Sequence, residues 1–392
     1  MTDHEIYFDN SATTALSCAA KEKMLEAMDC YGNPSSLHTR GVSADRLLRE
    51  ARENVLTALG VRHSTGGALV FTASGTEATN LALLGTAHAK SRRTANRIVI
   101  TDSEHPSVEN TARVLEKEGF EIVRVPTAKG VLDTEFLDKA LDRNVFLVSL
   151  MMVNNETGAR YDVERAFRLA KARNPEAITH CDAVQGFLKC RFTVQSLGAD
   201  LVTVSAHKIH GPKGVGALYI DKRILTRRAI VPTVTGGGQE NGLRSGTENV
   251  IGIAGFGEAA RSGFSTLDAD VSHLRALRDY AVERLSPLEL RLNLPIGETA
   301  PHILNLTLPD IRSETMLHFL SSKGIYVSAG SACSSHAAHP SSSLLAFGVS
   351  PEEAGHSIRI SFAKANTKDE IDAFTEALDE GIGTLVRVHR RR

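Results

Sequence analysis

The chain has 392 residues, of which 42% are hydrophobic and 23% charged, and its formal net charge is −1. This length predicts two domains with substantial cores. The balanced charge gives no indication of nucleic acid or an anionic membrane as a partner, and with neither a long apolar span nor an N-terminal signal pattern we expect a cytoplasmic protein.

The cysteines are odd in number and scattered over the chain, with no CxxC pair among them. They stand at Cys18, Cys30, Cys181, Cys190 and Cys333. This pattern argues against a disulfide framework and against a structural zinc site, so we expect no bound metal. At least one thiol is left for other chemistry.

The first part of the chain alternates strands and helices. A short strand at residues 6–14 breaks into a polar turn, and helices are expected at about 15–30 and 43–60. Apolar runs that end in polar turns then predict strands at 68–71, 98–101, 121–125, 146–151, 177–182 and 201–204. Helical stretches between these runs indicate a mostly parallel sheet that is covered by helices on both faces.

The character of the chain changes after residue 220. A long glycine-rich loop at 235–249 is followed by helices at about 250–262 and 267–285. Strands at 302–308, 325–328 and 357–362, with helices near 313–322 and 368–386, form a smaller α+β unit. We therefore predict a large domain of residues 14–262, and a small domain made of residues 1–13 and 263–392.

Polar residues that could act on a ligand follow several of the expected strands. The strand at 201–204 ends in Ser205, His207 and Lys208, and a lysine held at the carboxyl end of a strand can form a Schiff base with a carbonyl. Taken alone, this stretch fits a surface lysine in a turn better. Gly75 and Thr76 follow the strand at 68–71, where they predict either a phosphate site or an ordinary capped helix.

Four further residues stand at or just after strand ends: His105, Asn155, Asp182 and Gln185. Together with Lys208 and the turn at Gly75 and Thr76, which we call the anion turn, they are the groups that pyridoxal phosphate needs. The lysine holds the aldehyde, a carboxylate keeps the pyridine nitrogen protonated, and hydroxyls and backbone amides take the phosphate.

Nine sequence motifs carry a family resemblance that extends from about residue 5 to 380. They are YFDNSATT, GNPSSLH, SGTEATN at 74–80, EHPSVENT at 104–111, NNETG at 154–158, DAVQ at 182–185 with SAHKIHGPKGVGALYI at 205–220, RSGTEN at 244–249 and SAGSACSS at 328–335. In this order and spacing the chain resembles the class V aminotransferase family, and within it the cysteine desulfurases of the NifS/IscS type.

The resemblance implies a pyridoxal-phosphate-dependent transferase fold, with a large domain built on a mostly parallel seven-stranded sheet and a smaller α+β domain. It implies Lys208 as the cofactor lysine, His105 stacked on the cofactor ring, and Asp182 and Gln185 at the ring nitrogen and ring oxygen. The other implied cofactor residues are Gly75, Thr76, Asn155, Ser205, His207 and, from the second subunit of a homodimer, Thr247. Asn155 and Arg359 are implied at the substrate carboxylate.

The activity implied is the removal of sulfur from L-cysteine, which gives L-alanine and a persulfide on Cys333. Lys208, assisted by His105, would move the α-proton. The sulfur would pass to an acceptor protein, such as an iron–sulfur scaffold or a tRNA-thiolation enzyme. Cys333 precedes Arg359 by 26 residues, which resembles the members with a long cysteine loop. His336 and His339 follow the cysteine, and their role is left open.

The sequence is also compatible with other functions. A selenocysteine lyase on the same fold would carry nearly the same residues. A non-catalytic interaction protein that kept the fold would have no need of Lys208, Asp182, His105 and Cys333 together. A sulfur carrier of the rhodanese kind would use a lone cysteine and would leave the strand-end residues unexplained.

Overall fold

The computed structural model describes residues 5–61, 67–89, 94–329 and 340–387. Its centre is a seven-stranded sheet with the strand order β2-β8-β7-β6-β5-β3-β4. The strands are β2 (Gly67–Thr72), β3 (Arg97–Thr101), β4 (Glu121–Val125), β5 (Val145–Met151), β6 (Ile178–Asp182), β7 (Leu201–Ser205) and β8 (Gly216–Asp221). Strand β8 is antiparallel to both of its neighbours and the other pairs are parallel, so the predicted mostly parallel sheet is confirmed.

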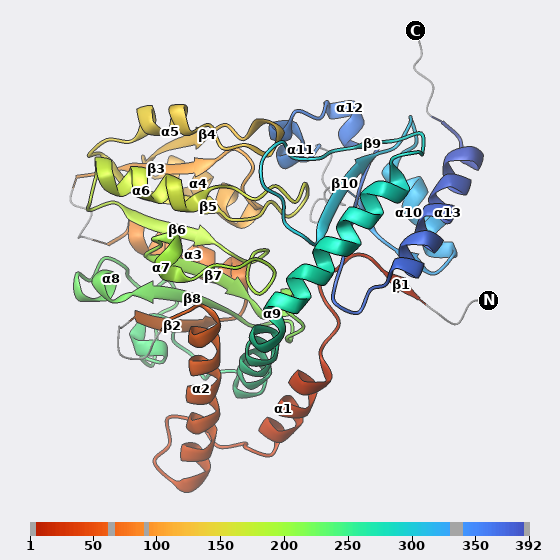
Figure 1. Cartoon of the computed structure of the whole chain (residues 1–392). Coiled ribbons are helices and arrows are strands. Elements are labelled where there is room, and N and C mark those ends of the chain that lie inside the picture. The colour runs from red at the N-terminus through yellow and green to blue at the C-terminus, as the bar shows by residue number, and fades with distance from the viewer. Residues whose placement is uncertain (1–4, 62–66, 90–93, 330–339, 388–392) are drawn as a thin grey trace.

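Helices cover both faces of this sheet (Figure 1). One face packs on α2 (Thr39–Ala58), α6 (Val163–Arg173) and the first half of α9 (Val250–Leu285), and the other on α3 (Gly75–Ala87) and α4 (Pro106–Lys117). The shorter helices are α1 (Cys18–Met28), α5 (Thr134–Ala140), α7 (Val194–Leu197) and α8 (Lys222–Thr226). Every residue of β5 is buried, as expected for a strand that is apolar on both faces.

A second core lies at the other end of the molecule, around a four-stranded sheet in the order β12-β13-β10-β9. Its elements are β9 (Arg291–Leu292), β10 (Ile303–Thr307), α10 (Ser313–Ser322), β11 (Ile325–Tyr326), β12 (Ser328–Ala329), α11 (Ser342–Phe347), α12 (Pro351–Ala354), β13 (Ser357–Ser361) and α13 (Lys368–Thr384). The N-terminal strand β1 (Ile6–Tyr7) pairs with β11, so the start of the chain belongs to this core.

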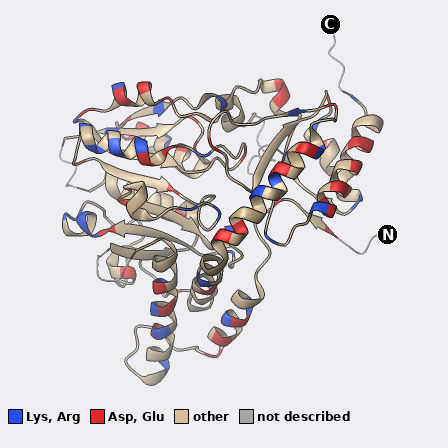
Figure 2. Cartoon of the chain, viewed as in Figure 1, with Lys and Arg blue, Asp and Glu red and all other residues tan. Residues whose placement is uncertain are grey.

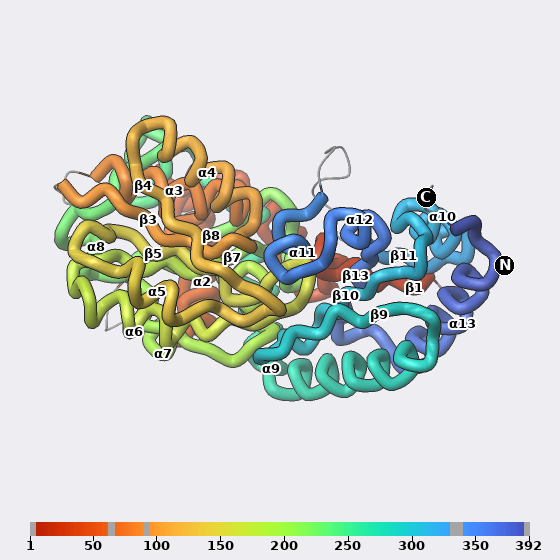
Figure 3. Tube along the Cα trace, turned by 90° about the horizontal axis from the view of Figure 1, so that it is seen from above, coloured from red at the N-terminus to blue at the C-terminus, as the bar shows by residue number. Residues whose placement is uncertain are grey.

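Helix α9 corrects the prediction of two separate helices at 250–262 and 267–285. It runs unbroken for 36 residues, and Figure 3 shows its long coil beside the half of the molecule that holds β9, β10 and α13. Its first half contributes Phe256 to the core under the large sheet, and its second half contributes Leu277 to the small core. Between the two halves, the helix turns a different face toward the protein interior. In the sequence this change looks like a break in hydrophobic periodicity, and such a break also occurs where a helix ends. The predicted domain boundary falls inside this helix and stays a prediction.

Positively and negatively charged residues alternate along the helices, with no long run of one sign (Figure 2). Among the described helices, none combines the length and the apolar character needed to cross a bilayer.

The contact of α2 with α9 depends on a glycine. A Cβ atom added to Gly257 would lie 2.4 Å from the Cα atom of Ala51, closer than two carbon atoms can approach. We expect Gly257→Ala to lower the free energy of unfolding by about 1–3 kcal/mol, because the helices must separate. Urea denaturation of the full chain measures this.

The matched control is Gly383→Ala in α13, where an added Cβ meets nothing within 4 Å. There the better helix propensity of alanine should leave stability unchanged or raise it by up to about 1 kcal/mol. Equal effects of the two substitutions would contradict the packing argument.

Candidate active site

The site forms where the carboxyl ends of five strands meet. Strands β2, β3, β5, β6 and β7 all run in the same direction, because β2 is related to β7 through the antiparallel β8. Their carboxyl ends therefore share one edge of the sheet, which is the edge where open α/β sheets bind ligands.

A cavity of about 340 Å³ opens at this edge, a size that suits a small cofactor with its substrate. All the residues predicted to bind a cofactor or the substrate line it, apart from Thr247. They are Gly75, Thr76, His105, Asn155, Asp182, Gln185, Ser205, His207, Lys208 and Arg359. Cys333, like His336 and His339, lies outside the described residues.

Lys208 ends a single 3₁₀ turn (Ala206–Lys208) directly after β7. Its Nζ atom donates hydrogen bonds to the backbone carbonyls of Ser11 (2.6 Å) and Ala12 (2.7 Å). The same Ser11 carbonyl accepts a bond from the Gln185 amide at 2.9 Å. The N-terminal segment thus forms a wall of the cavity, a role that the sequence motif YFDNSATT did not reveal.

His105 is held in one orientation and one protonation state. It is the N-cap of α4, where its Nδ1 atom accepts the backbone N–H of Ser107 at 3.1 Å. An accepting Nδ1 carries no proton, so the neutral ring carries its proton on Nε2. Burial, with a smaller effect of the Lys208 charge, lowers the pKa of His105 to about 4. The ring is therefore a neutral imidazole at physiological pH.

Asp182 is a buried carboxylate at the end of β6. It accepts the backbone N–H of Val184 at 3.0 Å. Burial raises its pKa to about 6, although that N–H and the charge of Lys208 both act in the opposite direction. A positively charged ring N–H at this position would relieve the cost of burying the charge.

The anion turn opens helix α3. Gly75 is its first residue and Ser74 is the N-cap, accepting the N–H of Glu77, so this helix presents free N–H groups to the cavity. An added Cβ at Gly75 would lie 3.1 Å from a methyl group of Val184, so a larger residue there would require Val184 to shift. Lys213 lines an adjoining hollow together with Ser74, Ser205 and His207, and it adds a positive charge that the sequence analysis did not single out.

Four residues of the cavity wall have a buried polar atom with no hydrogen-bond partner among the described residues: Oε1 of Gln185, and with it Oγ of Ser11, Oγ of Ser205 and Nε of Arg359. Such atoms cost free energy unless a ligand or water satisfies them. Their positions, the carboxylate of Asp182 and the helix start at Gly75 fit the pyridine ring and the phosphate of pyridoxal phosphate.

Arg359 comes from β13 in the small core and is 2% exposed. Its guanidinium donates to the carbonyl of Asn155 (2.7 Å) and pairs with the carboxylate of Asp9 (2.8 Å). Sequence reasoning missed Asp9, because its only signal was its place in the N-terminal motif. A buried guanidinium in the cavity wall suits the bidentate recognition of a carboxylate.

Thr247 is exposed and does not line the cavity of its own chain. Its loop is nevertheless fixed at two points. Arg244 pairs with Glu77 of helix α3 at 2.8 Å, and the buried carboxylate of Glu240 pairs with Arg52 at 2.8 Å. The loop therefore holds Thr247 on the surface near the anion turn.

Of the remaining cysteines, Cys181 and Cys190 are buried and Cys18 is exposed. Cys181 packs in the core on the α2–α6 face of the sheet, as strand alternation predicts, and burial raises its pKa. Its thiol is therefore protonated and unreactive.

Comparison with known proteins identifies the same family over nearly the whole chain. The family model described as aminotransferase class-V matches residues 6–374. A cysteine desulfurase IscS from Dictyoglomus turgidum is 37% identical over 385 residues, which cover 97% of this chain and 95% of the relative.

Solved structures agree. A NifS-like protein superposes with a TM-score of 0.89 at 38% identity, covering 97% of this chain and all of that one. A structure described as SspA in complex with cysteine has a TM-score of 0.78 at 30% identity, covering 92% of this chain and all of that one.

Glu104, next to His105, is a buried carboxyl group whose pKa reports how strongly water is excluded beside the cavity. It is 3% exposed; its Oε1 atom accepts bonds from Thr101 and Met151, and its Oε2 atom has no partner among the described residues. Burial raises its pKa from 4.5 to about 8. Between these values the unfolded chain loses a proton that the folded chain keeps, so folding stability falls as the pH rises.

The wild type should lose unfolding free energy between pH 5 and pH 8 as Glu104 becomes harder to keep protonated. We expect Glu104→Gln to lose roughly 2–4 kcal/mol less over this range, because glutamine does not titrate. Denaturant unfolding at the two pH values measures it. Glu376→Gln, at an exposed position of α13, is the control and should follow the wild type. Parallel pH curves for wild type and Glu104→Gln would contradict the assignment.

Proposed function

This chain belongs to the class V aminotransferase family, and within it to the cysteine desulfurases of the NifS/IscS type, and we propose that it removes the sulfur of L-cysteine with pyridoxal 5′-phosphate as cofactor. One observation carries the proposal: an amine, a buried carboxylate and a neutral imidazole, from Lys208, Asp182 and His105, line one cavity at the strand ends. When bound, pyridoxal phosphate supplies an electron-withdrawing ring that stabilises negative charge at the substrate α-carbon.

Asp182 would face the pyridine nitrogen and keep it protonated. The raised pKa of this carboxyl supports the pairing, because a cationic ring N–H would offset the cost of burying its charge. The phosphate would lie at the start of α3, against Gly75 and Thr76, with the hydroxyl of Ser205 and the ring of His207. Gln185 would serve the ring oxygen.

Lys208 would attach the cofactor and, once the amine of the substrate has replaced it, act as the base that accepts the α-proton. His105 is less suited to that step, since its Nδ1 atom is occupied by Ser107 and its Nε2 atom already carries the proton. We therefore assign His105 the role of a neutral ring that packs on the cofactor and donates a hydrogen bond.

Arg359 and Asn155 would bind the substrate carboxylate. This fixes the α-carbon in front of Lys208 and leaves the side chain of cysteine free toward the sulfur acceptor. The guanidinium is already oriented by Asp9 and by the carbonyl of Asn155, so little rotamer freedom is lost when the substrate binds.

Cys333 would complete the reaction as a thiolate. Its sulfur forms a bond with the sulfur of the substrate while the carbon–sulfur bond of the substrate breaks. The products are a persulfide on Cys333 and L-alanine, whose β-carbon takes up a proton. The persulfide sulfur would then pass to an acceptor protein.

Incubation with L-cysteine tests this function directly. We expect Cys333→Ala to lower the formation of alanine and reductant-released sulfide at least about a hundredfold, because no thiolate attacks the substrate sulfur. The variant should keep the visible absorbance of the cofactor. Turnover of L-selenocysteine should persist, since selenium leaves without the help of a thiol.

The control is Cys18→Ala, which removes an exposed cysteine in α1 and should behave as wild type. Alanine formation by Cys333→Ala at the wild-type rate would refute the sulfur-transfer role. Material that takes up no pyridoxal phosphate, with Lys208 unmodified by borohydride, would refute the function as a whole.

A homodimer is part of the proposal, with Thr247 of each chain reaching the phosphate of the other. Large apolar side chains stand exposed on the arm formed by α1, α2 and their connection, among them Tyr31 at 77% and Leu37 at 98%. Such a group is commonly covered by a partner. Sedimentation should give twice the monomer mass, and a monomer at micromolar concentration would contradict the shared site.

A further inference from the structure

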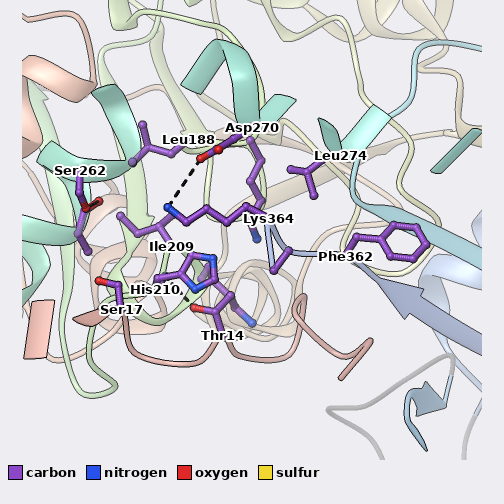
Figure 4. Close-up of a pocket in the computed structure, with 15 residues that line it drawn as sticks. Thr14, Ser17, Leu188, Ile209, His210, Ser262, Asp270, Leu274, Phe362 and Lys364 are labelled. Atoms are coloured by element: carbon purple, nitrogen blue, oxygen red, sulfur yellow. Dashed lines mark hydrogen bonds and ion pairs between the residues drawn. The ribbon is translucent and has the colours of Figure 1, made fainter. Parts of the chain in front are cut away.

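Two contacts between the halves of the molecule lie close to the active site. One surrounds a cavity of about 40 Å³ between the N-terminal segment, α9 and the chain after β13. Figure 4 shows Lys364 extending toward Asp270 there, and His210 beside Thr14. A cavity of this size holds about one water molecule, so no substrate fits in it. The other contact is made by the start of helix α11, which follows Cys333 in the chain.

Helix α11 is joined to the loops of the large sheet by two side-chain hydrogen bonds. The hydroxyl of Ser341 donates to the carboxylate of Glu156 at 2.6 Å, and the hydroxyl of Ser343 donates to the carbonyl of Ser103 at 3.2 Å. All four residues are buried. Ser103 follows β3 and Glu156 follows β5, so α11 rests on the same edge of the sheet that forms the active-site cavity.

Apolar packing does little to fix this helix. Its buried apolar side chains belong to a small cluster of their own, which is separate from the cores of both sheets. The members are Leu344, Phe347, Val349 and Ala354. Most helices in proteins are held by an apolar face that packs into a larger core. Because α11 has no such face against either core, its position depends strongly on its polar contacts.

The carboxylate that holds α11 lies in a turn that is itself fixed. Oδ1 of Asn154 accepts the N–H of Glu156 at 3.0 Å, while Nδ2 of Asn154 donates to the carbonyl of Ser103 at 3.1 Å. This is the carbonyl that also accepts the hydroxyl of Ser343. The two attachment points of α11 are therefore connected to each other through one amide side chain.

Glu156 is also next to the residues proposed to bind the substrate carboxylate. Asn155, directly before it, offers its carbonyl to Arg359 at 2.7 Å, and both of these residues line the cavity. The strand that precedes Cys333 lies at the same place, because Ser328 of β12 pairs with Arg359 of β13. The chain is thus fixed beside the substrate site both before and after residues 330–339.

The bond between Ser341 and Glu156 is of the strong kind. A hydrogen bond to an ionised carboxylate is shorter and stronger than one to a neutral oxygen. Burial raises the pKa of Glu156 to about 7, and the bond from Ser341 and the charge of Arg359 act in the opposite direction. Ser341 is also the N-cap of α11, where its Oγ atom accepts the N–H of Leu344 at 3.3 Å. The carboxylate therefore fixes the first turn of the helix.

We propose that Glu156 is a positioning residue for the sulfur-transfer step: through its bond to Ser341 it fixes the start of α11, and so limits where the chain can carry Cys333, eight residues earlier. Glu156 and Ser341 act through the chain and not on the substrate, since the residues that line the cavity do not include them. The inference rests on the proposed function, because it requires that Cys333 attack the substrate sulfur.

Steady-state kinetics with two substrates test this role. Ser341→Ala removes the hydroxyl that Glu156 holds. We expect kcat with L-cysteine to fall roughly tenfold, because the thiolate is less often in place. The KM for L-cysteine and the visible absorbance of the cofactor should stay at their wild-type values. Turnover of L-selenocysteine, which needs no thiolate, should also stay unchanged.

Further variants separate positioning from a general loss of structure. Ser341→Thr keeps a hydroxyl and should restore most of the activity with L-cysteine. Ser342→Ala, at the exposed neighbouring position in α11, is the matched control and should behave as wild type. Glu156→Ala should resemble Ser341→Ala. The double variant should be no slower than the slower single variant, because both substitutions break the same bond.

Urea unfolding of the full chain after removal of cofactor examines the contact itself. Glu156→Ala and Ser341→Ala should each lower the urea midpoint, and the double variant should lower it by clearly less than the sum of the two shifts. This measurement does not depend on the activity of the protein.

Wild-type kcat with L-cysteine in Ser341→Ala overturns the positioning role. Equal losses with L-cysteine and L-selenocysteine overturn it as well, because they would show a general defect of the site. Strictly additive midpoint shifts would mean that Glu156 and Ser341 do not interact. If Cys333→Ala instead formed alanine at the wild-type rate, the proposed function would fail while the urea coupling stayed measurable, so the two failures are distinguishable.

Discussion

The contact between the Lys208 amine and the carbonyls of Ser11 and Ala12 is the interaction on which the rest of the site depends. The segment that offers these carbonyls is anchored in the small core, where the ring of Phe8 packs edge-on against Phe362 with centroids 5.2 Å apart. A few residues later its Thr14 hydroxyl donates to the carbonyl of His207 at 3.0 Å. The segment from Phe8 to Thr14 is therefore anchored in the small core and holds in place Lys208, which belongs to the large domain.

The electrostatic character of the site follows from how little water reaches it. Burial holds His105 and His207 as neutral rings and favours the protonated forms of Glu104 and Asp182. The charges that remain are mainly cationic, from Lys208, Lys213 and the guanidinium of Arg359, so the site suits a bound phosphate and a substrate carboxylate. Each of these groups meets a described partner of suitable chemistry.

Much of the fold and site follows from local sequence patterns. Apolar runs ending in small polar residues located six strands of the large sheet, and the rule that ligands bind at carboxyl ends brought Gly75, His105, Asp182 and Lys208 together correctly. What failed were features decided by tertiary contacts. The continuity of α9 depends on which core each half meets, and Asp9 has no local pattern that separates it from a surface charge. Arg359 was placed only by family resemblance, since its strand gives no sign of facing a distant cavity.

The unbroken helix α9 also limits how the molecule can move. At 1.5 Å per residue its 36 residues span about 54 Å, with one end packed under the large sheet and the other in the small core. A hinge needs a few residues whose dihedral angles are free to change, and a hydrogen-bonded helix offers none. Any closing of the small core over the cavity must therefore bend this helix along its whole length or slide the two cores past each other, and both favour small displacements over wide opening.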